Sequence, residues 1–161
     1  MTDPRVRRVR PDDVPAIVAL VEELAEYERA RHECRLTTEQ LHDVLFRPNA
    51  ALFGHVAEVD GRVVGVALWF LNFSTWRGTH GIYLEDLFVQ PDQRGSGLGR
   101  ALLQALAEEC ARQGYARLEW AVLNWNDPAI GFYRSLGAVP MDEWTVFRLT
   151  DDALTRLGRD G

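Results

Sequence analysis

The chain has 161 residues, of which 47% are hydrophobic and 26% are charged, and its formal net charge is −6. This is enough for one domain, residues 1–161, that buries its own core without metal or disulfides. The acidic balance and scattered arginines argue against a nucleic-acid partner, which needs clustered positive charge. There is no apolar run of membrane length and no apolar core of a signal peptide, so we expect a cytoplasmic protein. The negative net charge favours a small cationic molecule as its partner.

The first expected elements are a strand and two helices. Residues 6–10 suggest a strand, and apolar residues recur at helical spacing over residues 14–24. Asp12-Asp13 stands just before this helix, where an aspartate can act as the cap. Residues 37–40, Thr-Thr-Glu-Gln, have the spacing of a capping box and predict a short helix that ends at about Phe46.

Three strands are expected next. Residues 52–59 and 62–70 flank Asp60-Gly61, the two-residue signal of a β-hairpin, so these two strands should be antiparallel. The apolar run at residues 82–89 predicts the following strand.

The remainder alternates helices and strands. A helix with one apolar face is expected from Leu98 to near Gly114, then a strand over 117–123. A helix capped by Asp127 and stopped by Gly137 follows, then a last strand at 145–149. The resulting order, β-α-α-β-β-β-α-β-α-β, predicts an α/β (α+β) fold with a mixed central sheet flanked by helices.

A glycine-rich turn connects the strand at 82–89 to the following helix. Alternate glycines allow tight turns and close approach of a ligand, and the N–H groups and dipole of the helix start favour an anion. The chain contains no lysine, which excludes the GxxxxGK[ST] phosphate loop, and alternating glycines past mid-chain do not fit a dinucleotide fold. The turn therefore predicts a phosphate-bearing ligand. The residues concerned are Arg94, Gly95, Ser96, Gly97, Leu98, Gly99 and Arg100.

Metal and thiol chemistry are not expected. Cys34 and Cys110 are too few and too isolated for a disulfide framework, and Cys110 lies in an apolar helical stripe. The histidines are scattered, and His32 near Cys34 lacks a second pair of ligands, so no metal site is assigned.

Two motifs resemble those of the Gcn5-related N-acetyltransferase superfamily, and they occur in the same order along the chain. Arg94–Gly99 fits its pyrophosphate signature R/Q-x-x-G-x-G/A, and Asn126–Gly137 fits its pattern Asn-x-x-Ala-x-x-Phe-Tyr-x-x-x-Gly. The expected element order is also that of the acetyltransferase fold. The resemblance implies that acetyl-CoA is the cosubstrate. It implies cofactor contacts from the turn residues named above and from Leu87, Phe88, Val89, Asn126, Asp127, Pro128 and Ala129.

The resemblance is more specific over residues 9–149. Glu22–Glu28, Tyr83–Val89 and Trp125–Pro128 look like the corresponding blocks of the spermidine/spermine (diamine) N-acetyltransferase family. This similarity implies acetyl transfer to a primary amine by a homodimeric enzyme.

Two side chains carry the expected chemistry. An alkylammonium, with a pKa of about 10, must lose a proton before it attacks a thioester. Glu85 resembles the family's proposed base, acting directly or through water, and Tyr133 matches its general acid. Asp86 should point to the opposite face of the strand unless a bulge intervenes, and a backbone N–H within 87–89 would hold the oxyanion. The alternatives are that Glu85 is a solvated acid and that Tyr133 is a packed core aromatic.

Acids and aromatics are expected around the amine. The substrate contacts implied by the resemblance, with Trp76 as a possible cation–π partner, are Tyr27, Glu28, Trp76, Glu85 and Glu143. Ser74 stands where the family has an acid, and residues 139–144 form a shorter segment than in the polyamine enzymes. These departures favour a shorter diamine or a thia-lysine-like amino acid as substrate.

Two other functions stay open. One is an acetyltransferase of the same fold that acts on another amino acid, an antibiotic or a protein N-terminus. The other is a CoA-binding module without catalysis, against which the presence of both Glu85 and Tyr133 argues.

Overall fold

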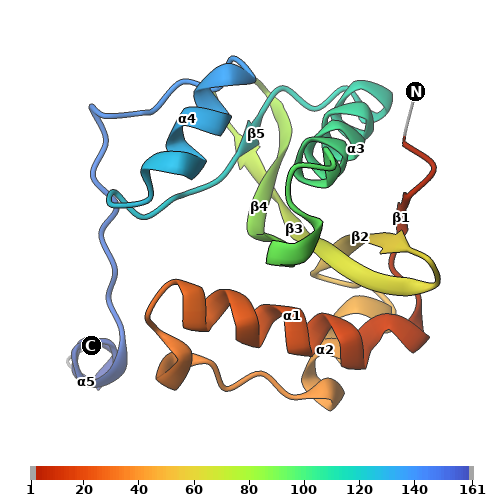
Figure 1. Ribbon diagram of the computed structural model, residues 1–161. Coiled ribbons are helices and arrows are strands. Elements are labelled where there is room, and N and C mark those ends of the chain that lie inside the picture. Colours follow the sequence, from red (N-terminus) through yellow and green to blue (C-terminus); the bar gives the residue numbers. More distant parts are fainter. Residues whose placement is uncertain (1–2, 160–161) are drawn as a thin grey trace. The chain divides into compact units, whose positions relative to one another are not determined.

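A mixed five-stranded sheet dominates the first part of the chain (Figure 1). The computed structural model describes residues 3–159 and divides the chain into two units, with the boundary between Ala121 and Val122. The strand order is β1-β2-β3-β4-β5, antiparallel except for the parallel pair β4–β5. The strands are β1 (Val6–Arg8), β2 (Phe53–Val59), β3 (Arg62–Ser74), β4 (Thr79–Val89) and β5 (Leu118–Glu119).

Helices cover both faces of this sheet (Figure 1). Helices α1 (Val14–Tyr27) and α2 (Thr38–Phe46) lie on one face, and α3 (Leu98–Gln113) lies on the other. The predicted capping box of α2 is confirmed, since Thr37 and Gln40 exchange side-chain to backbone hydrogen bonds of 3.0 and 3.1 Å. Within the described residues no helix is long and apolar enough to cross a membrane.

The core between α1, α2 and the sheet follows from helical and strand periodicity. Ile17 and Leu20, on one side of α1, are buried and pack in a cluster with Val66, Leu68 and Phe88 of the sheet. Each such side chain contributes about 1.5–3 kcal/mol when it is fully buried. This packing places the C-terminal end of α1 beside β4.

The hairpin between β2 and β3 confirms the two-residue turn. Asp60 and Gly61 have φ of +52° and +76°, the left-handed pair of a type I′ turn. Strand β3 is longer than predicted, because its pairing with β4 continues to Ser74 opposite Thr79. Polar residues such as Asn72 interrupt the apolar run in the last part of β3, so the apolar pattern predicted that this strand ends at residue 70.

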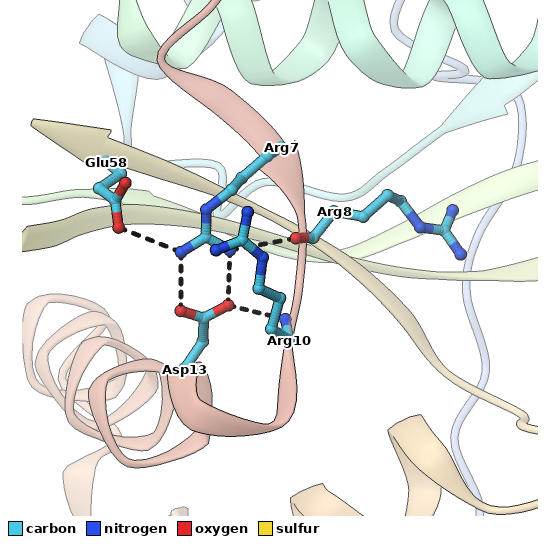
Figure 2. Close-up of polar contacts among 5 residues, drawn as sticks. All are labelled: Arg7, Arg8, Arg10, Asp13 and Glu58. Atoms are coloured by element: carbon cyan, nitrogen blue, oxygen red, sulfur yellow. Dashed lines mark hydrogen bonds and ion pairs between the residues drawn. The ribbon is translucent and has the colours of Figure 1, made fainter. Parts of the chain in front are cut away.

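Asp13 stands at the N-cap position of α1, as predicted, but its side chain has another role. Asp13 makes no side-chain cap to α1; instead its carboxylate accepts two hydrogen bonds from the Arg7 guanidinium, at 2.8 and 2.9 Å, and one from the Arg10 backbone N–H at 2.7 Å (Figure 2). Arg7 also donates to Glu58 at 3.1 Å. The Arg7 hydrogen bonds lower the pKa of Asp13. Arg7 therefore connects β1 to β2 through Glu58 and to the start of α1 through Asp13.

The second unit contains α4 (Asp127–Ser135) and α5 (Asp151–Arg159). Two strand predictions are corrected, one in each unit. Strand β5 covers two residues rather than 117–123, and residues 145–149 form no strand, although they were expected to form the last one. Val146 and Phe147 are 84% and 92% exposed. A strand needs a paired neighbour to be stable, and the described part of this unit contains no strand that could pair with the segment.

Candidate active site

A β-bulge in β4 determines how its carboxylates are presented. Asp86 pairs with Leu68 of β3 and Leu84 pairs with Trp69, so Glu85 is the additional residue between two consecutive pairs. Regular alternation would send Glu85 and Asp86 to opposite faces of the sheet. A bulge interrupts that alternation, and both residues contribute to the lining of one pocket.

This pocket lies within the first unit and has a volume of about 430 Å³, in the range of small-molecule sites. Its walls come from the C-terminal half of α1, from the segment that follows α1, and from the bulge of β4. Four carboxylates and one guanidinium stand among its lining residues. The lining residues are Val21, Leu24, Ala25, Glu28, Ala30, Glu33, Cys34, Arg35, Leu36, Glu85 and Asp86.

The pocket raises the pKa of its two less exposed carboxylates, Asp86 and Glu28. Burial, and then the charges of Glu85 and Glu28, raise the pKa of Asp86 to about 6. Burial also raises the pKa of Glu28. The half-buried Asp86 thus titrates near neutral pH, whereas Glu85 beside it is exposed to solvent. Asp86 was not among the predicted site residues, because nothing local in the sequence marks the bulge.

The glycine-rich turn has the geometry of an anion site. After the short 3-10 helix η3 (Pro91–Gln93), Gly95 and Gly97 adopt φ of +87° and +82°, and Gly97 immediately precedes the 16-residue helix α3. A Cβ at either glycine would meet nothing within 4 Å, so the turn is open on that side. The first N–H groups of a helix have no intrahelical acceptor. These residues therefore fit the pyrophosphate of acetyl-CoA.

Arg94 connects this turn to the end of α1. Its Nε donates to the Val89 carbonyl at 3.2 Å, and its guanidinium carbon lies 5.5 Å from the ring centroid of Tyr27 and 5.6 Å from that of Phe88. The predicted cofactor residue Arg94 and the predicted substrate residue Tyr27 are thus in direct contact. Tyr27 is the last residue of α1 and precedes Glu28 of the pocket.

Strand β4 diverges early from its parallel neighbour. Parallel pairing with β5 involves Ile82 and Tyr83 only, whereas pairing with β3 continues to Val89. Among the described residues, β4 has no strand on its β5 side from Leu84 onward. The parallel pairing between β4 and β5 therefore ends at Tyr83, before the residues 87–89 that are expected to hold the oxyanion. A role for the backbone N–H groups of Leu87–Val89 stays a prediction.

The second unit places its predicted site residues on α4. Asn126, not Asp127 as predicted, caps the helix: its side-chain oxygen accepts from the Ala129 N–H at 3.4 Å. Tyr133 is half-buried, with its ring centroid 5.6 Å from that of Phe132. The roles of these residues in binding and catalysis stay predictions.

Two predicted substrate contacts of the first unit, Tyr27 and Trp76, do not line the pocket. Trp76 is 83% exposed in the turn between β3 and β4, and Glu143 is exposed in a turn of the second unit. Of the predicted substrate residues, the pocket brings together Glu28 and Glu85, and the structure adds Asp86 and Glu33 to them.

Comparison with known proteins defines the class. Residues 17–138 match the acetyltransferase (GNAT) family, and the chain belongs to this family. It is 33% identical to a thialysine N-epsilon-acetyltransferase of Mus musculus over 98% of both chains. It is 30% identical to an L-ornithine N5-acetyltransferase of Arabidopsis thaliana, covering 96% of this chain and 88% of that one. An integron cassette protein from the mobile metagenome of V. cholerae has the same fold, with a TM-score of 0.80, 25% identity and 96% coverage of both chains.

These findings confirm the predicted superfamily, the mixed α/β fold and the enzyme class. The chain is an N-acetyltransferase, and acetyl-CoA is its cosubstrate.

Proposed function

We propose that the two units form one N-acetyltransferase domain that acetylates a primary amine of a small cationic substrate. The observation that carries the proposal is the acidic pocket, in which four carboxylates surround about 430 Å³. A carboxylate cluster favours an ammonium group through opposite charge. Thialysine and ornithine, named in the relatives, are amino acids with a terminal amine. The substrate we favour is therefore such an amino acid or a short diamine.

We assign cofactor binding, proton transfer and charge stabilisation to separate groups of the chain. Bound acetyl-CoA supplies the acyl group as a thioester. The helix start at Gly97 and Leu98, with Asn126–Ala129 of α4, holds the phosphate and pantetheine parts. A carboxylate of β4, for which the sequence prediction names Glu85, takes a proton from the ammonium. Tyr133 donates a proton to the departing thiolate, and a backbone N–H within 87–89 stabilises negative charge on the carbonyl oxygen.

A panel of amines tests this function. Purified enzyme with acetyl-CoA is offered thialysine, ornithine, lysine, diamines of increasing length, spermidine, an aminoglycoside and monoamines, and thiol release is followed. We expect the highest kcat/KM for an amino acid with a terminal amine or for a short diamine. Equal use of monoamines would contradict the proposed acidic recognition. Preference for the aminoglycoside would support the alternative acceptor class.

We also propose that the enzyme is a homodimer located in the cytoplasm. Support for the dimer comes from apolar side chains that are more than half exposed between α4 and α5, since contiguous exposed apolar surface marks protein interfaces. These residues are Val139, Met141, Trp144, Val146 and Phe147. Sedimentation equilibrium tests the dimer: a monomer at micromolar concentration would contradict it. A cytoplasmic location stays a prediction.

A further inference from the structure

We infer that Asp86, rather than Glu85, accepts the proton from the substrate ammonium. Glu85 and Glu28 provide the negative charge that attracts this ammonium to the pocket. This inference rests on the proposed function and assigns its proton acceptor. The first reason is geometric. The bulge at Glu85 brings two consecutive carboxylates of β4 into one pocket, so the choice between them depends on their surroundings rather than on strand alternation.

Their surroundings differ. Asp86 is half-buried, and its cross-strand partner in β3 is the buried Leu68, whereas Glu85 is exposed. A carboxylate that has lost hydration binds a proton more tightly than one in water. Asp86 therefore binds a proton more tightly than a hydrated aspartate does.

The other charged and titratable groups of the pocket come from each neighbouring element. Glu28 directly follows α1, the segment after it provides Glu33, Cys34 and Arg35, and β4 provides Glu85. Burial, Glu85 and Glu28 together raise the pKa of Asp86 from 3.8 to about 6. Relative to an unperturbed aspartate, this makes proton transfer from an ammonium about 100-fold less unfavourable. Asp86 still carries its charge at pH 7.5, so it is able to accept a proton there.

The proton balance of the reaction is complete with Asp86 as acceptor. The ammonium nitrogen gives one proton to Asp86, and its lone pair forms the new C–N bond as the C–S bond of the thioester breaks. The nitrogen gives a second proton to water on forming the amide. The departing sulfur ends as a thiol by taking a proton from Tyr133, and the resulting phenolate takes one proton back from water. Asp86 releases its proton to water. One proton is set free for each ammonium that is acetylated.

The test compares two isosteric variants, Asp86→Asn and Glu85→Gln, with the preferred amine of the panel. We expect Asp86→Asn to lower kcat by about 10²- to 10⁴-fold, the range for loss of a general base, and to abolish the rise of kcat/KM with pH near 6. Glu85→Gln should mainly raise KM for the amine and move that rise to lower pH, because a charge that raises the pKa of Asp86 is gone. Calorimetry with CoA and the thermal unfolding midpoint serve as controls for folding.

A second readout does not depend on turnover. In the ¹³C-labelled wild-type protein without substrate, the Asp86 carboxyl carbon should titrate with a midpoint near 6, and this midpoint should fall in Glu85→Gln and in Glu28→Gln. A midpoint near 4 in the wild type overturns the inference even if Asp86→Asn does not fold. It is also overturned if Asp86→Asn keeps kcat within about threefold of wild type, or keeps the rise near pH 6. Failure of all amines in the panel would instead contradict the proposed function, with the titration still deciding the state of Asp86.

Discussion

The guanidinium of Arg94 lies over the ring of Tyr27, 5.5 Å from its centroid, and connects the glycine-rich turn to the end of α1. A cation–π contact of this kind is worth about 0.5–2 kcal/mol, depending on exposure. We therefore predict that Tyr27→Leu weakens CoA binding by about 2- to 30-fold, although Tyr27 is expected to contact the amine rather than the cofactor. Calorimetry measures the effect. Trp76→Leu, which changes an exposed aromatic outside the pocket, is the control, and equal CoA affinities for the two variants would refute the coupling.

Gly97→Ala should weaken CoA binding and stability through the backbone alone. Gly97 has φ of +82°, and its Cβ would meet nothing within 4 Å, so the cost comes from the left-handed conformation and not from a steric contact. That conformation costs an L-residue about 1–2 kcal/mol. The matched control is Gly131→Ala in α4, where the added Cβ is also uncontacted and φ is not positive; helix propensity predicts a neutral or stabilising effect there. Thermal unfolding distinguishes the two, and an unchanged Gly97→Ala protein would argue against the strained cap.

Tyr133→Phe should retain CoA affinity and lose turnover. The substitution removes only the hydroxyl, so the ring can still pack beside Phe132, and loss of a general acid lowers kcat by about 10²- to 10⁴-fold. Stopped-flow and steady-state assays with calorimetry separate binding from chemistry. A decrease below about threefold would return Tyr133 to the role of a packed aromatic.

Glu28→Gln should reduce discrimination between diamines and monoamines. Glu28 lines the pocket and can hold the second ammonium, so the variant should raise KM for a diamine by about tenfold, or about 1.4 kcal/mol, and raise KM for a monoamine by less. High salt should produce the same trend in the wild type. Glu26→Gln is the matched control, since Glu26 is exposed on α1 and is not part of the lining. Identical behaviour of the two variants would remove Glu28 from substrate recognition.

Asp13→Asn should destabilise the fold in a pH-dependent way. Breaking a largely buried ion pair costs roughly 3 kcal/mol, the low end of its range, because Arg7 is partly exposed and keeps Glu58. Since Arg7 lowers the pKa of Asp13, the pair stabilises the folded state above about pH 4 and loses this effect as the pH falls through the lowered pKa. Urea unfolding of wild type and variant should therefore converge in acid. Asp12→Asn is the exposed control, and a difference that does not shrink as the pH falls below about 4 would contradict the account.

The features that sequence reasoning predicted correctly depend on local chemistry. The Asp60-Gly61 turn requires two left-handed residues, the cap at Thr37 requires only Gln40 three positions later, and the glycine turn is encoded within seven residues. Each has one favourable local conformation, so neighbouring residues suffice to specify it.

The features that it missed depend on partners distant in the chain. Glu85 is a bulge only because β3 pairs with Leu84 and Asp86 on either side of it, so Asp86 could not be assigned to the pocket from alternation. Asp13 has the residue type of a cap, but its carboxylate binds Arg7 of β1 instead. Residues 145–149 include β-branched and aromatic residues that are typical of a strand, but strand formation requires a neighbour that the sequence pattern cannot supply.

The bulge also changes what the apolar pattern of β4 can do. Ile82, Leu84 and Phe88 are all buried and all stand at even positions, which in a regular strand would put them on a single face. Among the described residues, Phe88 belongs to the cluster with α1 and α2, whereas Ile82 and Leu84 do not. The additional residue at Glu85 therefore places apolar side chains of β4 first on one face of the sheet and then on the other, although their spacing in the sequence stays at two residues. Deletion of Glu85 would leave Leu84 and Asp86 adjacent in a regular strand and still on opposite faces, so both interiors would keep their side chains while the pocket would lose one carboxylate.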